Sequence, residues 1–494
     1  MPKKFILFLI ISIAVGISFA WTIRARLHHN NTVKILPVPP QDREIAWFHT
    51  STSFASWERF VAGIHRAAKR IPELEFDDSR AFLEHSTSTP EVTLSWRDQS
   101  SKIRIRWYKV SNDASVRQWL DALSRRDPPP LAIIGGGSSD RARDLARDLN
   151  DCTRWQGPRP LLLITTATAN DVSFGTDVQS YPLISIYPER SFRFCFTNKQ
   201  MARAVIDFVW SKQELRPHGA EGDKPGQEHP PLVLPVDWGD DPYSVDLSDK
   251  FREATHLYTI PLPFPGLSER PKYSVGSFDR ANRSEAHYVQ KISSELPTGP
   301  GQRALLIIPT SPTPARRFIR ALAAGSPLLG RHLVAVTGDS INLDTVYRDG
   351  AILWNMSDVP VPLVFFAHNN PISWDDELRP PNGTDEVLLF ANLIKAVALS
   401  SFRPDQPIVA DADELRIALR QQSIVKFDKD GNRADGEEYV VWLRPEISED
   451  GRINSHSLLE VWRRLPGGTW KQKNAEPLRA PYPTAPLRPN PELK

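Results

Sequence analysis

Cysteine and methionine are scarce in this sequence, with two and three residues among 494. Two cysteines can form at most one disulfide bond. In an exported chain Cys152 and Cys195 could pair, but cysteine also behaves as a small buried hydrophobe. We favour two unpaired thiols, so we do not expect a disulfide to hold the fold together.

An excess of charge of either sign is missing as well. Lysine and arginine number 61, aspartate and glutamate number 59, and the formal net charge is +2. A strongly basic chain would be drawn to nucleic acid or to acidic lipid, and this balance provides no such attraction. We therefore expect no nucleic-acid partner.

Signatures of catalytic and metal sites are also missing. The twelve histidines are scattered, without HExxH or Cys–His metal spacing. The stretch GGGSSD at residues 135–140 fits neither a P-loop, nor GxSxG, nor GxGxxG. In residues 428–432, DKDGN, the glycine comes too early for an EF-hand loop and the twelfth position holds no glutamate. We expect a protein that is not an enzyme, with no cofactor and no metal site.

One long hydrophobic run stands at the N-terminus. Residues 5–23 carry no charge and are flanked by Lys3, Lys4, Arg24 and Arg26. Such a run can span a bilayer as one helix. The rival interpretation is a signal peptide, because Ser-Phe-Ala at 18–20 resembles a cleavage site, and cleavage would release a secreted protein. We favour an uncleaved transmembrane helix because the run exceeds a usual signal core.

The most informative stretch alternates strands and helices. The apolar run 131–134 ends in three glycines, a helix is predicted over 140–149, and a second apolar run, 161–164, ends in the hydroxyl-rich turn 165–170. This order is typical of a βαβ unit, and in open α/β sheets ligands bind outside the carboxyl ends of the strands. The pattern predicts a cleft lined by backbone N–H groups and small hydroxyls.

Similar patterns recur along the chain. Residues 56–70 have the apolar spacing of an amphipathic helix. Further strands are expected at 44–49, 102–110, 232–237, 256–260, 304–308 and 332–337, and further helices at 114–125, 199–210, 244–254, 284–295, 314–323, 384–400 and 412–421.

The order of these pieces resembles the type I periplasmic-binding-protein family, especially its branched-chain amino-acid-binding branch. The matching segments are 135–139, 165–170, 192–196, 233–251, 303–322 and 425–442. The resemblance implies an α/β fold of two Rossmann-like lobes with parallel central sheets, linked by a hinge that the chain crosses three times.

The resemblance also implies boundaries. Residues 1–23 would be the anchor and 24–42 a linker. Lobe one would comprise 43–195 and 365–445, lobe two 196–364, and a Pro-rich extension 446–494.

Six ligand-binding residues follow from the resemblance, and five of them have a simpler alternative. The two serines after the glycines could instead cap the helix. The residues of the second turn could serve only local hydrogen bonding, and the tyrosine could belong to a surface turn. No acidic residue corresponds to the one that grips an amino group in amino-acid binders. The candidates are Ser138, Ser139, Ala167, Thr168, Tyr243 and Thr310.

The functional expectation is a membrane-anchored, extracytoplasmic (periplasmic) binding protein. Its two lobes would close on a small molecule, amino-acid-like or another polar metabolite, by hinge motion. An ABC permease or another envelope protein would be its partner. The alternative is a ligand-free interaction or structural module of an envelope complex, built on the same fold.

Overall fold

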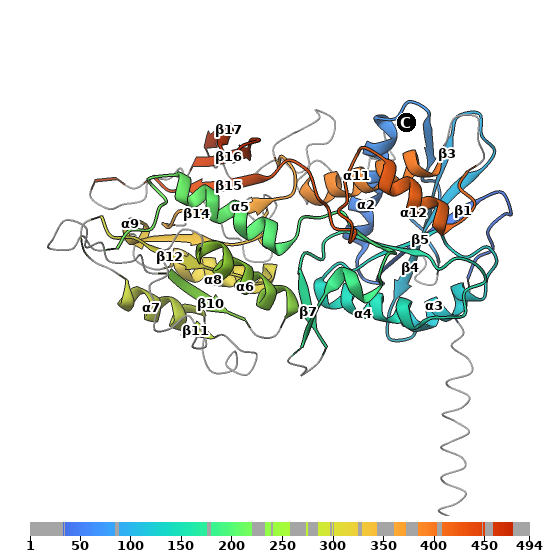
Figure 1. Cartoon of the computed structure of the whole chain (residues 1–494). Coiled ribbons are helices and arrows are strands. Elements are labelled where there is room, and N and C mark those ends of the chain that lie inside the picture. The colour runs from blue at the N-terminus through green and yellow to red at the C-terminus, as the bar shows by residue number, and fades with distance from the viewer. Residues whose placement is uncertain are drawn as a thin grey trace, which may run out of the picture.

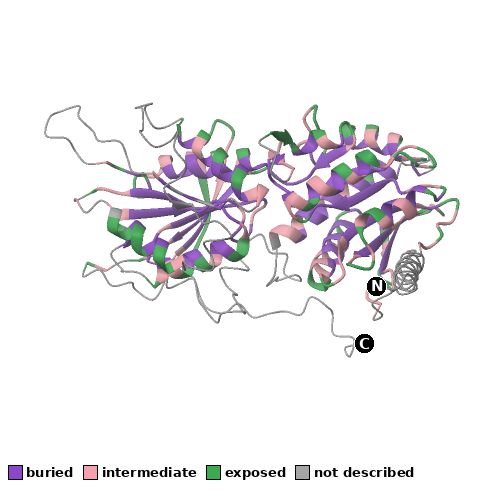
Figure 2. Cartoon of the chain, turned by 90° about the horizontal axis from the view of Figure 1, so that it is seen from below, coloured by how far each residue is buried: buried purple, intermediate pink, exposed green. Residues whose placement is uncertain are grey.

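The chain forms two α/β lobes that lie side by side (Figure 1). In each lobe a central sheet carries helices on both faces, and the sheet strands are largely buried (Figure 2). This computed structural model describes residues 33, 35–83, 88–174, 179–219, 233–238, 241–256, 273–274, 285–296, 299, 301–324, 329–342, 360–371, 384–402, 408–446, 448–449 and 458–477.

Lobe one is built on a seven-stranded sheet in the order β2-β3-β4-β1-β5-β6-β9. The strands from β4 to β9 run parallel, whereas β2 and β3 are antiparallel additions. Strands such as AIIG and LLLI are continuous apolar runs because helices cover both faces of the sheet. The strands are β1 (Arg43–Thr50), β2 (Leu74–Asp77), β3 (Glu91–Trp96), β4 (Lys102–Val110), β5 (Ala132–Gly135), β6 (Leu161–Ile164) and β9 (Ser191–Arg193).

Two groups of helices sandwich this sheet. One core contains α2 (Phe54–Lys69), α11 (Thr384–Ser401) and α12 (Ala412–Gln421). Gly63 allows α2 and α11 to approach closely, because a Cβ there would lie 2.6 Å from the Cβ of Phe390. The other core contains α3 (Val116–Ser124), α4 (Ser139–Asp151) and the short 3-10 helix η1 (Leu183–Ile186). A small two-stranded sheet, β7 (Asp171–Ser173) and β8 (Ser180–Pro182), lies beside them.

Lobe two is built on an eight-stranded sheet in the order β11-β10-β12-β13-β14-β15-β16-β17. The pairs from β11 to β14 are parallel and those from β14 to β17 antiparallel. The strands are β10 (Val233–Asp237), β11 (Tyr273–Ser274), β12 (Ala304–Ile307), β13 (Leu333–Val336), β14 (Leu363–Ala367), β15 (Tyr439–Arg444), β16 (Leu458–Arg464) and β17 (Trp470–Pro477).

Helices also cover both faces of the second sheet. α5 (Asn198–Ser211) and α6 (Pro242–His256) share one core with it. α7 (Glu285–Glu295) and α8 (Pro312–Ala323) share the other, beside the single turn α9 (Leu329–His332). The chain passes between the lobes after β9, after β14 and before β15, which agrees with the three expected crossings.

The sheets divide the chain differently from the expected boundaries. We expected residues 365–445 to complete lobe one and residues 446–494 to form an extension. Instead β14, β15, β16 and β17 all belong to the sheet of lobe two. The reason is burial on both faces: Val441 enters one core of lobe two while Val440 enters the other. Such a strand requires a place inside a covered sheet.

Other expectations have mixed outcomes. The helix expected at 114–125 begins after Ser115, whose side chain forms a capping box with Gln118. Cys152 and Cys195 are both free thiols, as we favoured. A strand was expected at 256–260, but residue 256 is the last residue of α6 and residues 257–260 lie outside the described residues. Residues 1–23, the expected anchor, also lie outside the described residues. Among the residues that the structure describes, no helix combines the length and hydrophobicity needed to cross a bilayer.

Candidate functional site

The parallel strands of both lobes end at a shared space, where a central cavity of about 270 Å³ lies. From lobe one it is lined by Ser138 and Ser139 at the start of α4 and by Thr166 after β6. From lobe two it is lined by Tyr243 at the start of α6 and by Asp339 after β13. The cavity is therefore built where open α/β sheets place their ligands.

Three of the six sequence-predicted residues meet at this cavity, namely Ser138, Ser139 and Tyr243. Ser138 occupies the N-cap position of α4 without a side-chain capping bond. The Ser139 hydroxyl accepts a hydrogen bond of 3.2 Å from the Ala169 N–H. Ser139 thus fixes the turn after β6 against the helix, whereas Ser138 lines the cavity without capping the helix.

The other three predicted residues are buried and are not among the residues that line the cavity. The carbonyl of Thr168 accepts hydrogen bonds from the Asn198 N–H and the Arg193 guanidinium, which ties the turn to the first crossing. The Ala167 carbonyl accepts from the Cys195 thiol. Thr310 lies 3.4 Å from the Ser244 hydroxyl inside lobe two.

Two acidic residues of lobe two, Asp241 and Asp339, line the cavity. Asp339 lies between Tyr243 and His368. It accepts a hydrogen bond of 2.7 Å from the Tyr243 hydroxyl and one of 2.8 Å from Nε2 of His368. Burial alone would raise the pKa of Asp339, but the bonds from His368 and Tyr243 hold it below the ordinary value. Burial and the neighbouring Asp339 raise the pKa of Tyr243 well above its usual range. Asp339 is therefore an anion at neutral pH, and Tyr243 is a neutral donor.

Two hydrogen bonds orient the ring of His368. Its Nδ1 lies 3.3 Å from the Phe196 N–H, which can only donate. Its Nε2 lies 2.8 Å from the Asp339 carboxylate, which can only accept, so Nε2–H is the donor of that bond.

Two further carboxylates at the start of α11 reach the cavity from lobe one. Asp385 accepts bonds from the His368 N–H and from Asn369, and burial raises its pKa. Burial also raises the pKa of Glu386, and this shift is opposed by Arg59, whose Nε lies 2.6 Å from the Glu386 carboxylate. In the described part of the chain, no three such groups are arranged as metal ligands.

The sequence predictions missed Asp339, His368, Asp385 and Glu386. Asp339 has a recognisable signal, since it follows the expected strand 332–337 in the run Val-Thr-Gly-Asp-Ser. This is the same strand-then-polar-turn pattern that pointed to Gly135 and Thr165. His368, by contrast, directly follows β14, a strand that was not identified before the structure.

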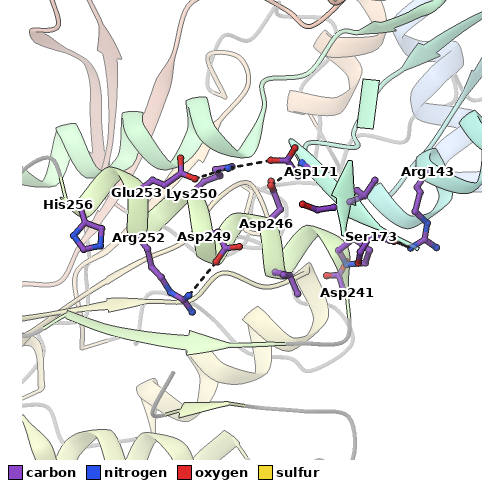
Figure 3. Close-up of a pocket in the computed structure, with 14 residues that line it drawn as sticks. Arg143, Asp171, Ser173, Asp241, Asp246, Asp249, Lys250, Arg252, Glu253 and His256 are labelled. Atoms are coloured by element: carbon purple, nitrogen blue, oxygen red, sulfur yellow. Dashed lines mark hydrogen bonds and ion pairs between the residues drawn. The ribbon is translucent and has the colours of Figure 1, made fainter. Parts of the chain in front are cut away.

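A second, peripheral groove of about 630 Å³ lies between α6 of lobe two and the β7–β8 sheet of lobe one (Figure 3). Its walls carry both signs of charge, and most of these side chains pair with each other. Asp246 lies at its inner edge and accepts hydrogen bonds from Asn170 N, Asp171 N and the Asn198 side chain. Lys250, one turn further along α6, lies 3.5 Å from the Asp171 carboxylate. The groove is thus a seam that connects the lobes.

Comparison with known proteins gives matches of structure only. No family model matches the chain, and no curated protein matches it. A solute-binding protein of an ABC transporter from R. palustris, solved with 4-hydroxybenzoate, is 11% identical with a TM-score of 0.50, over 83% of this chain and 95% of that one. The chain has the two-lobed periplasmic-binding-protein fold. The fold expected from the resemblance is confirmed.

Other solved structures are similar at lower scores. An ABC-transporter substrate-binding protein from Desulfitobacterium hafniense is 14% identical with a TM-score of 0.49, over 84% of this chain and 98% of that one. A branched-chain amino-acid-binding protein from Streptococcus pneumoniae, solved with isoleucine, is 12% identical with a TM-score of 0.47, over 85% of this chain and 99% of that one.

Proposed function

We propose that this protein binds a small polar molecule in the central cavity between its lobes and releases it chemically unchanged. The single observation that carries the proposal is that both lobes build one cavity, with Ser138 on one wall and Tyr243 and Asp339 on the other. A ligand that contacts both walls stabilises the closed arrangement of the lobes, because it binds that state better than the open one.

The charges of the cavity indicate which chemical group faces lobe two. Asp339 is a half-buried anion whose hydrogen bonds come from Tyr243 and His368. A buried charge is costly unless it is paired. The cavity is also lined by the carboxyl groups of Asp241, Asp385 and Glu386. An amino group of the ligand would be attracted to this cluster of acidic groups, so we propose a ligand that carries one.

The proposal also covers the cellular location of the protein and its partner. We propose that residues 5–23 anchor the chain in a membrane and that the lobes are extracytoplasmic, delivering their ligand to an ABC permease or to another envelope partner. The R. palustris protein of similar fold supports the part that concerns an ABC permease, since it is a solute-binding protein of an ABC transporter.

Ligand-dependent thermal stability of the full chain tests the binding proposal. The panel contains amino acids, amides, amines, aromatic carboxylates and sugars. A ligand present at a hundred times its Kd adds about 2.7 kcal/mol to the unfolding free energy. We expect at least one amine-bearing compound to raise the melting temperature by several degrees.

Two matched variants locate the effect. Asp339→Asn keeps the shape of the side chain but removes its charge, and it should abolish the response to the amine-bearing ligand. Asp430→Asn makes the same change on an exposed residue outside the cavity and should leave the response intact. A panel with no response, together with envelope proteins that co-purify, would instead support a ligand-free interaction module.

A further inference from the structure

The three segments that cross between the lobes meet around the ring of Phe196. Phe196 belongs to the first crossing, His368 to the second and Arg433 to the third. The ring of His368 stacks on that of Phe196, with centroids 5.9 Å apart and planes 11° apart. The Arg433 guanidinium lies 4.1 Å from the centroid of the same ring and donates a hydrogen bond to the Phe194 carbonyl. The crossings therefore form one packed unit, in which a movement of one changes the contacts of the other two.

His368 contacts both lobes as well as the first crossing. Its backbone N–H donates a bond of 2.8 Å to Asp385, at the start of α11 in lobe one. Its Nε2–H donates a bond of 2.8 Å to Asp339, which follows β13 in lobe two. The Phe196 N–H donates to its Nδ1 over 3.3 Å. One orientation of the imidazole therefore satisfies two partners at once.

The imidazole connects a group that a ligand can touch with one that it cannot reach. Asp339 and His368 line the central cavity, whereas Phe196 is buried and is not among the lining residues. The side chain of His368 is 7% exposed. A ring packed this closely does not turn without displacing its neighbours. Its orientation is therefore transmitted to the backbone of the first crossing.

We propose that His368 is a positioning residue that couples the cavity to the hinge. The Asp339 carboxylate sets the orientation of the imidazole, and the imidazole holds the first crossing through the Phe196 N–H. A ligand amino group that binds Asp339 shares this carboxylate with His368 and so alters the hold on the crossing. The inference rests on the proposed function and names the residue through which binding reaches the hinge.

Hydrogen exchange of single amides in the full chain tests this coupling without a ligand. Asp339→Ala removes the acceptor of Nε2–H and leaves the partners of the Phe196 N–H in place. We expect the Phe196 amide to exchange about 3- to 10-fold faster in this variant, the range for the loss of one hydrogen bond. The Phe194 N–H donates to the Ile164 carbonyl within lobe one and should exchange at its native rate.

Two isosteric variants of His368 separate the two bonds of its ring. In His368→Gln the amide nitrogen reaches as far as Nε2 and donates to Asp339, but no acceptor stands where Nδ1 was. In His368→Asn the amide oxygen takes the place of Nδ1 and accepts from the Phe196 N–H, but the side chain is too short to reach Asp339. We expect fast exchange of the Phe196 amide in the glutamine variant and slow exchange in the asparagine variant.

Combination with Asp339→Ala completes the cycle. In either His368 variant the alanine substitution should change Phe196 exchange by less than about 2-fold, because the connection is already broken. Asp339→Asn keeps an acceptor oxygen and should return exchange to within about 2-fold of the native rate. Ser138→Ala changes another residue that lines the cavity and should have no effect.

Three results would overturn the coupling. Phe196 exchange could be unchanged by Asp339→Ala, it could rise equally with that of Phe194, or the alanine substitution could act as strongly in His368→Asn as in the native chain. If Asp339→Ala does not fold, equal Phe196 exchange in the glutamine and asparagine variants would overturn it too. Because no ligand is used, any of these results leaves binding between the lobes intact. A ligand panel without a response would contradict the proposed function and leave these exchange rates as they are.

Discussion

The carboxylate of Asp246 in lobe two accepts a hydrogen bond of 2.8 Å from the backbone N–H of Asn170 in lobe one. The same carboxylate also accepts from the Asp171 N–H, at 3.1 Å. It is only 5% exposed, so water does not replace these partners. One side chain of α6 therefore holds the turn that follows β6 and connects the two halves of the site.

Removal of this side chain should destabilise the protein. Asp246→Ala leaves two backbone N–H groups and the Asn198 amide without their acceptor. Unsatisfied buried groups cost about 1–3 kcal/mol each, with partial relief from water that enters. We expect the free energy of unfolding in urea to fall by about 2–4 kcal/mol. Asp249→Ala, on the exposed side of the same helix, should change it by less than about 0.5 kcal/mol.

The seam should also respond to pH. Burial raises the pKa of Asp246 from 3.8 to about 6, although its backbone partners and Lys250 oppose the shift. The folded state then holds this proton more tightly than the unfolded state does. The stabilisation that comes from this protonated carboxyl, measured as free energy of unfolding, is fully present below pH 4 and is lost as the pH rises through 6. A pKa shift of this size corresponds to a change of roughly 3 kcal/mol in the free energy of unfolding.

Comparison with Asp246→Asn isolates this effect. The difference in unfolding free energy between the native protein and the variant should fall between pH 4 and pH 6.5. A difference that stays constant over this range would show that Asp246 titrates at its ordinary pKa. Asp249→Asn, on the same helix, is the control for general effects of charge.

Much of the fold could be predicted because buried parallel strands and amphipathic helices leave strong local patterns. The runs 131–134 and 161–164 and the helix 56–70 match β5, β6 and α2 to within a few residues. The missed strands include β2, β3, β14, β16 and β17. β17 reads Trp-Lys-Gln-Lys-Asn-Ala-Glu-Pro, mostly polar, and becomes a strand through its pairing with β16. Such pairing is decided by distant residues, which a local pattern does not reveal.

The candidate site was predictable only in part, for a related reason. Ser138 and Ser139 follow a strand end that the sequence displays, and Tyr243 starts a helix that it also displays. Asp385 and Glu386 begin a helix that belongs to lobe one although it follows a strand of lobe two. Their place at the cavity depends on the second crossing of the chain, which brings distant segments together.

His49 should make the free energy of unfolding depend on pH in the opposite direction to Asp246. Its pKa falls from 6.5 to about 4 through burial and the nearby arginines, so the folded state binds this proton less readily than the unfolded state. Stability should therefore fall as the pH drops from 6.5 to 4, by roughly 2–3 kcal/mol. His49→Gln should remove this loss, measured as urea unfolding at each pH. An unchanged acid limb in the variant would contradict the assigned shift.

The C-terminal strands should be as important for stability as the rest of lobe two. Leu459 is fully buried on β16 and belongs to the core that it shares with β15 and α8. Substitution of a buried leucine by alanine typically costs 2–5 kcal/mol, because apolar contacts are lost and a cavity remains. We expect Leu459→Ala to lower the unfolding free energy by about 3 kcal/mol and to increase amide exchange in β14 and β15. Gln472→Ala, at an exposed position of the neighbouring strand, is the matched control. If Leu459→Ala behaved like that control, residues 458–477 would be an attached extension, as the sequence first indicated, and not part of the lobe-two core.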